Sequence, residues 1–245
     1  MPIPILTYHQ IDIVPPHGTP FRGLTVSPRQ FRLQMTWMRR LGYRGLSMRE
    51  LMPYIQGKAV GKVFGITFDD GFRNVHRHAL PVLAELGFSA TNYFVAGQID
   101  GSNVWDTGQG IPPAALMNAA EVREWARLGN EVGAHTIDHV HLSAVPLAEA
   151  RRQIEGCKAK LEDLVSMPIT AFCYPYGEQQ AAHRELVREA GYDNATLTQR
   201  GLARADDDPF GLPRVNVHCG TNLLRFLQKC LTRHEDKRRA IGLES

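Results

Sequence analysis

The feature that most constrains the fold is the alternation of short apolar runs with segments of helical periodicity. Residues 62–68 form a nearly continuous apolar run, which is typical of a strand buried on both faces of a parallel sheet. Equivalent strands are predicted at residues 3–8, 63–68, 90–95, 131–134, 170–174, 193–196 and 212–217. The pattern therefore predicts an α/β protein with a parallel sheet.

Helical patterns lie between these runs. Ser27 and Pro28 predict an N-cap followed by proline at the first helical position, and Phe31, Met35 and Met38 then repeat at helical spacing. Further helices are predicted at residues 47–55, 75–86, 121–128, 147–164, 183–190 and 223–231. About seven strands alternating with helices predict one irregular parallel α/β barrel, with an open doubly wound sheet as the alternative.

The chain has 245 residues, a length that allows one barrel-sized domain or two small ones. Because we find no repeat and no linker between domains, we expect residues 1–245 to form a single domain, with a flexible tail at 235–245. The stretches 14–23 and 97–113 read as long loops, which in compact domains are often functional.

Charge and apolar patterning exclude several functions. The net charge is only +3, and the basic stretch 233–239 also contains acids, so we expect no nucleic-acid partner. No apolar run reaches membrane-spanning length. Because the first residues lack a basic and then apolar leader pattern, we expect a cytoplasmic protein, or an exported one if a leader was removed. The cysteines are expected to be reduced and structural: Cys157, Cys173, Cys219 and Cys230.

Two short motifs carry the chemistry. Thr67-Phe-Asp-Asp-Gly71 and His135-Thr-Ile-Asp-His139 each follow a predicted strand, so both should lie at the carboxyl ends of strands, where parallel barrels gather their functional residues. Imidazole and carboxylate are the usual ligands of a zinc-like ion, and a catalytic site keeps three of them with one position open for water. Each motif alone is more typical of a turn or of packed histidines.

With a third motif, Tyr174-Pro-Tyr-Gly177, this order of motifs resembles the polysaccharide deacetylase family, also called the NodB homology domain or carbohydrate esterase family 4. The segments Pro4-Ile-Leu-Thr-Tyr-His-Gln-Ile11 and Leu212-Pro-Arg-Val215 resemble its branch of bacterial exopolysaccharide and cell-surface glycan deacetylases. The resemblance implies a distorted (β/α)₇ barrel. It also implies one divalent ion, Zn²⁺ first with Co²⁺ or Ni²⁺ as alternatives, and hydrolysis of N-acetyl groups on N-acetylhexosamine units of a glycan or glycolipid precursor.

The resemblance also implies roles for individual residues. Asp69 would be the general base, and a metal-bound water would be the nucleophile. The metal ligands would be Asp70, His135 and His139. The backbone N–H of Tyr176 would help to hold the oxyanion, within a substrate-binding loop that also contains Tyr174 and Pro175.

The chain departs from the family pattern at two points. Many members carry an arginine shortly before the Pro-Tyr of the third motif, paired with the base; here we hypothesise that Arg214 supplies that charge, the alternative being a surface arginine. His218 is the candidate for the acid that protonates the leaving amine, although its surroundings match the family poorly. His9 and Trp105 are candidate substrate contacts, or else a packed imidazole and a loop anchor.

Other functions remain open at this point. An esterase for O-acetyl groups or an amidase for a non-sugar amide would use the same tetrahedral chemistry on the same scaffold. A sugar-binding domain with degraded catalysis is a third alternative, against which the intact Asp69, Asp70, His135 and His139 argue.

Overall fold

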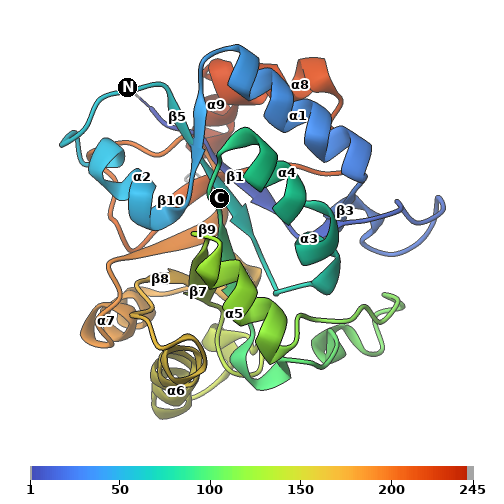
Figure 1. The fold of residues 1–245 in the computed structure, drawn as a ribbon. Helices are drawn as coiled ribbons and strands as arrows, with labels where there is room; N and C mark the ends of the chain where they lie inside the picture. Colours follow the sequence, from blue (N-terminus) through green and yellow to red (C-terminus); the bar gives the residue numbers. More distant parts are fainter. Residues whose placement is uncertain (1, 242–245) are drawn as a thin grey trace.

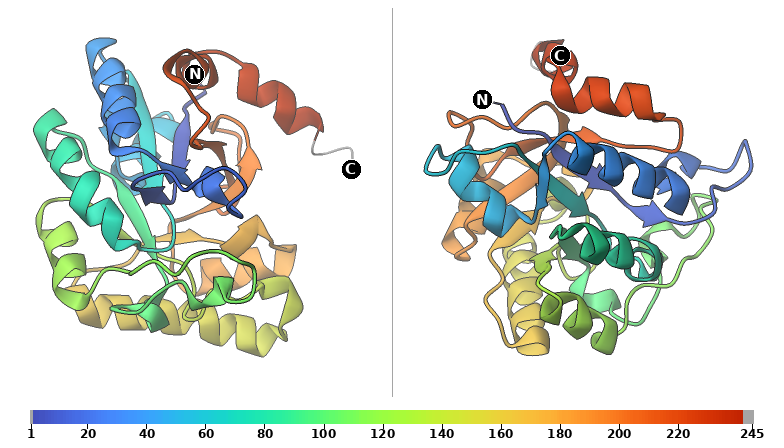
Figure 2. Two further views of the ribbon diagram at one scale, coloured as in Figure 1. Left: turned by 90° about the vertical axis from the view of Figure 1, so that its right-hand side faces the viewer. Right: turned by 45° about the horizontal axis from the view of Figure 1, so that its top comes forward.

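The computed structural model describes residues 2–241 and consists of a ring of parallel strands surrounded by helices (Figures 1 and 2). The strands are β1 (Ile5–Tyr8), β2 (Gln10–Ile11), β3 (Thr25–Val26), β4 (Arg44–Leu46), β5 (Val63–Phe68), β6 (Thr91–Phe94), β7 (Glu131–Ala134), β8 (Ala171–Cys173), β9 (Asn194–Arg200) and β10 (Leu212–Asn216). Each of the seven predicted strands is present, with ends that differ by up to four residues from the prediction.

The main sheet closes on itself. Its strand order is β1-β10-β9-β8-β7-β6-β5, and β1 pairs with β5 in parallel from Ile5 opposite Gly65 to Tyr8 opposite Phe68. β5 pairs with β4 along its first half and with β6 along its second half, so β4 adds a short eighth strand outside the ring. The prediction of an irregular seven-stranded parallel barrel in a single domain is confirmed, and the open doubly wound sheet is wrong.

Nine α-helices are assigned in residues 2–241. They are α1 (Pro28–Arg40), α2 (Met48–Ile55), α3 (Arg73–His78), α4 (Leu80–Leu86), α5 (Ala119–Arg127), α6 (Leu147–Val165), α7 (Ala181–Glu189), α8 (Leu223–Leu231) and α9 (His234–Ile241). The Ser27 side chain caps α1 by accepting the N–H of Gln30, as the sequence predicts. The single helix predicted at 75–86 is instead two helices, because Pro81 has no N–H to continue the helical hydrogen bonding of α3.

The tail predicted from residue 235 is also corrected as far as residue 241. There the chain forms α9, and the buried Glu235 accepts two hydrogen bonds from Arg200, at 2.7 and 2.9 Å. This charge pair holds the helix against the end of β9. Residues 242–245 lie outside the described part of the chain.

The alternation of side chains along the strands divides the core in two. On β5, Phe64, Ile66 and Phe68 face outward and pack with the surrounding helices. On the inside, the end of the barrel at which the strands begin is filled by Ile5, Tyr93 and side chains of α2 such as Leu51. Because α2 covers this end, the barrel interior opens at the opposite end, where the strands finish and a cleft is present. In residues 2–241 no helix has the length and apolar character that would let it cross a bilayer.

Candidate metal centre

The strand ends bring the predicted metal ligands together. Asp69 and Asp70 follow β5, and His135 follows β7, two strands along the sheet. Asp69 continues the inward-facing positions of β5, after Thr67. Asp70 breaks this alternation with a left-handed backbone (φ 74°), and His139 also has a positive φ of 56°. Such conformations are strained for residues with side chains and gather at functional sites.

Asp70, His135 and His139 form a compact buried cluster. The Asp70 Oδ1 lies 3.4 Å from the Nε2 of His135 and 3.3 Å from the Nε2 of His139. All three ligand atoms are within 4.8 Å of one another. This is the set of two imidazoles and one carboxylate that binds a zinc-like ion and leaves a further position open.

The outer nitrogens of both imidazoles are held by neighbours. The His135 Nδ1 lies 2.7 Å from the carbonyl oxygen of Cys173, which can only accept, so Nδ1 carries the proton and Nε2 presents its lone pair. The His139 Nδ1 lies 3.1 Å from the Tyr176 hydroxyl, which can accept in the same way. Two lone pairs and a carboxylate oxygen facing one another repel unless a cation lies between them. The residues present therefore fit a divalent metal ion.

Electrostatics favour the ligand forms of Asp70 and His139, whereas the neighbouring Cys173 and Asp70 raise the pKa of His135 despite its burial. Burial alone would raise the pKa of Asp70, but the adjacent imidazoles of His135 and His139 hold the pKa well below its usual value. Burial lowers the pKa of His139, which favours the neutral imidazole. A cation would thus meet an ionised carboxylate and an uncharged imidazole.

Arg214 lies directly beside Asp69. Its guanidinium donates two parallel bonds of 2.7 Å to Oδ1 and Oδ2 of Asp69, and it also donates to Thr67 and to the carbonyl of Leu197. Both charged side chains are buried, with Arg214 0% exposed. Burial would raise the pKa of Asp69, but the charge and hydrogen bonds of Arg214 hold the pKa below its usual value. Arg214 is not the surface arginine of the alternative reading.

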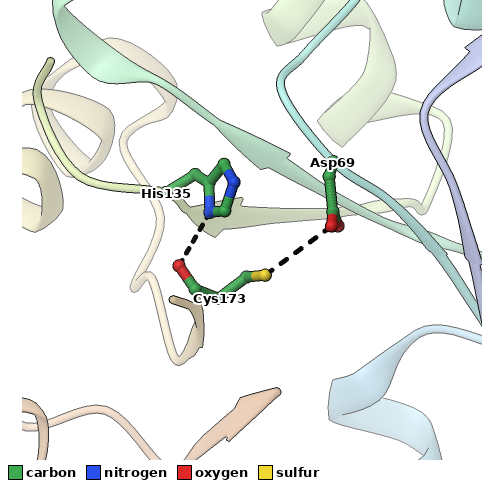
Figure 3. A group of neighbouring side chains, drawn as sticks. All are labelled: Asp69, His135 and Cys173. Atoms are coloured by element: carbon green, nitrogen blue, oxygen red, sulfur yellow. Dashed lines mark hydrogen bonds between the residues drawn. The ribbon is translucent and has the colours of Figure 1, made fainter. Parts of the chain in front are cut away.

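Cys173 is a neighbour of this pair that the sequence did not indicate. It is a buried free cysteine, and its Sγ lies 3.2 Å from the Arg214 guanidinium. Figure 3 shows the thiol directed at Asp69, whose Oδ2 lies 3.8 Å from Sγ. Asp69, His135 and Cys173 also have ligand atoms close enough to hold a metal. In that set, however, both oxygens of Asp69 already bind Arg214, and a second cation there would be repelled. The cluster of Asp70 with the two histidines is the better metal site.

The third motif, residues 174–177, forms a tight loop beside His139. Pro175 is buried, and Tyr176 has a left-handed backbone (φ 59°). Its carbonyl accepts a hydrogen bond of 3.2 Å from the Thr198 hydroxyl. Burial raises the pKa of Tyr176 to about 12, so its hydroxyl stays protonated at neutral pH. Tyr174 borders the cleft, but its ring is buried and its hydroxyl donates to the carbonyl of Phe210, so its side chain supports the loop instead of contacting a ligand.

The remaining predicted residues line the cleft over this cluster. The Trp105 ring stacks on His139 with 4.5 Å between centroids, so Trp105 both anchors its loop and forms a wall of the site. The His9 Nε2 is 3.9 Å from Asp69 Oδ2. The His218 Nδ1 accepts the N–H of Gly220 at 3.1 Å. Burial and the nearby Lys229 lower the pKa of His218, so it is neutral at neutral pH.

The cleft has a volume of about 560 Å³, in the range of small-ligand sites. Its walls come from the ends of β1, β5, β7 and β10 and from the two long loops predicted in the sequence. The lining includes His9, Asp69, Asp70, Trp105, His135, His139, Tyr174, Tyr176 and His218. A concave site that places a buried carboxylate and a candidate metal cluster at its floor is suited to hydrolysis.

Comparison with known proteins agrees with the family that the motifs predict. Residues 56–195, more than half of the chain, match the family model for polysaccharide deacetylase. YxkH of Bacillus subtilis is 27% identical over 89% of this chain and 72% of its own length. The poly-β-1,6-N-acetyl-D-glucosamine N-deacetylase of Escherichia coli is 23% identical over 87% of this chain but only 37% of its own length.

A solved structure shows the same fold. The deacetylase PplD of Streptococcus pyogenes, in complex with acetate, superposes with a TM-score of 0.82 over 94% of this chain and 98% of its own, at 24% identity. The chain belongs to the polysaccharide deacetylase family, as its three motifs predict.

Proposed function

We propose that the protein is a metal-dependent hydrolase that removes N-acetyl groups from N-acetylhexosamine units of a glycan. The observation that carries the proposal is that two adjacent carboxylates have different partners. Asp70 lies within 3.4 Å of both histidines, whereas Asp69 points away from them to Arg214. One carboxylate is thus available as a ligand and the other as a base. The E. coli relative, a poly-β-1,6-N-acetyl-D-glucosamine N-deacetylase, supports an N-acetylated glycan as the substrate.

The residues of the site would divide the reaction among them. Asp70, His135 and His139 would hold a divalent ion, with Zn²⁺ as first choice, which when bound lowers the pKa of water and polarises a carbonyl. Asp69 takes the proton of the water that attacks the acetamide carbon. Its two oxygens have about four lone-pair sites, and Arg214 uses only two, so acceptor capacity remains. The low pKa of Asp69 keeps the base ionised.

Two further steps use the rim of the cleft. The backbone N–H of Tyr176 donates to the carbonyl oxygen as negative charge develops on it. His218 lines the cleft with its Nδ1 already bonded to the backbone, so it presents its Nε2–H as a hydrogen-bond donor to the leaving group, and the proton that Asp69 took from the water passes to the amine as the C–N bond breaks. His9, near Asp69, orients the water or the substrate.

Acetate release is the first test of this proposal. Wild-type protein should release acetate from β-1,6-linked oligomers of N-acetylglucosamine, lose this activity after treatment with a chelator, and regain it with zinc or cobalt. Acetate is measured by proton NMR, with an O-acetylated sugar in a parallel reaction. Release from the O-acetyl ester alone would replace the amidase with an esterase. Glycan binding without acetate release from either compound would make the protein a binding domain.

A further inference from the structure

Phe21 is an exposed aromatic residue at the edge of the cleft. Its side chain is 57% exposed, and its backbone lies in the left-handed region (φ 52°, ψ 19°). An aromatic residue in this conformation costs folding free energy that Asn or Gly would not. Strain of this kind at a ligand cleft points to a function for the side chain.

The loop that carries Phe21 is fixed from both sides. The Leu24 N–H donates to the carbonyl of Phe21 at 2.8 Å, and the Arg22 Nε donates to the carbonyl of Pro15 at 3.0 Å. The Cys219 N–H donates to the carbonyl of Gly23 at 3.2 Å, which ties the loop to the segment after β10. The backbone that carries the ring is thus tied to its surroundings by these hydrogen bonds.

Phe21 stands between two hollows. One is the catalytic cleft, and the other is a neighbouring hollow of about 320 Å³; both are bordered by Gln10, Phe21 and Ile111. The second hollow has a mixed lining of prolines and other apolar residues with polar side chains, which include Asp12, Thr19, Asn74 and Arg77. A ring face flanked by hydrogen-bonding groups is the surface that a pyranose requires, because a sugar has an apolar C–H face and hydroxyls at its edge.

We propose that Phe21 is a stacking platform for the sugar unit next to the one being deacetylated, and that the second hollow is its subsite. The substrate is then a chain of at least two hexosamine units, and a single sugar would leave this subsite empty. The inference rests on the proposed function, since the neighbouring unit is defined by the one whose acetyl group is removed.

The test compares F21N, which keeps a residue suited to the left-handed backbone, with F21Y, which keeps the ring. Removing an aromatic contact of this kind should lower kcat/KM for a β-1,6-linked pentasaccharide about tenfold in F21N, while kcat/KM for N-acetylglucosamine is unchanged. F21Y should stay within about twofold of wild type. Because Asn relieves the strain, the Tm of F21N should equal or exceed that of wild type.

A second measurement separates this inference from the proposed function. Chelator-treated protein cannot turn over the pentasaccharide, so its binding is measured by calorimetry, and F21N should bind about tenfold more weakly than wild type. If wild type releases no acetate but this difference in binding persists, the proposed function fails and the platform stands. Equal binding by F21N and wild type, or an equal loss of kcat/KM on monosaccharide and pentasaccharide, would overturn the platform.

Discussion

Replacing Asp69 with asparagine is expected to lower kcat for deacetylation by about 10²–10⁴-fold, the usual contribution of a general base. Asparagine keeps the size of the side chain but cannot take a proton. Because Asp69 lies outside the cluster of Asp70, His135 and His139, D69N should keep the zinc affinity of wild type within a few-fold. Zinc affinity is measured by calorimetry and kcat by acetate release.

The control for D69N is D163N, which makes the same chemical change at an exposed position on α6. D163N should match wild type in both measurements. A D69N protein that folds, binds zinc and retains the wild-type kcat would remove Asp69 from the role of base. Loss of zinc affinity in D69N equal to that in a ligand variant such as H139A would instead make Asp69 part of the metal site.

Replacing Arg214 with methionine should destabilise the fold by about 3–5 kcal/mol, because it leaves the buried Asp69 carboxylate without its partner. Methionine fills much of the space but carries no charge. The free energy of unfolding is measured by urea denaturation at pH 7, in the presence of a chelator so that metal binding does not contribute. Acetate release should fall as well, because Asp69 is no longer held in place.

The double variant D69N/R214M distinguishes loss of the charge pair from loss of packing. With both charges removed, no buried ion is left unpaired, so the double variant should be more stable than R214M alone. If its free energy of unfolding is instead the sum of the two single losses, the two side chains do not interact as the hydrogen bonds of 2.7 Å imply.

The pair also makes stability depend on pH. The pKa of Asp69 in the folded chain is lower than in the unfolded chain, so its stabilising contribution is present above the unfolded pKa of about 3.9 and is lost as pH falls through the folded value. R214M should lack this contribution across the same acidic range.

Much of the fold could be predicted from the sequence because the apolar runs and helical stripes are strong. The elements that the sequence did not predict are short or have few apolar residues. β4 has only three residues, Arg44–Leu46, and two of them are arginine and glycine, so no apolar run marks it. The tail prediction failed because α9 has few apolar residues and is held by charge pairs such as Arg200 with Glu235, which depend on the tertiary fold.

The ligand cluster could be predicted because its residues lie in compact motifs at strand ends. The surroundings of Asp69 were harder to foresee. Arg214 lies 145 residues away in the chain and reaches Asp69 only because the barrel closes through β10 and β1. Cys173 immediately precedes the third motif, but nothing in the sequence indicates that its thiol faces Asp69. Phe21 sits in a loop without a motif, and only its backbone conformation and exposure draw attention to it.

The most direct test of the account is an anomalous-difference map from a crystal soaked in zinc. We expect one strong peak, about 2.0–2.2 Å from Asp70 Oδ1 and from the Nε2 atoms of His135 and His139, with Asp69 outside the coordination sphere. A map without a peak at this position, or a peak bound instead by Asp69, His135 and Cys173, would contradict the assignment of metal ligands and base.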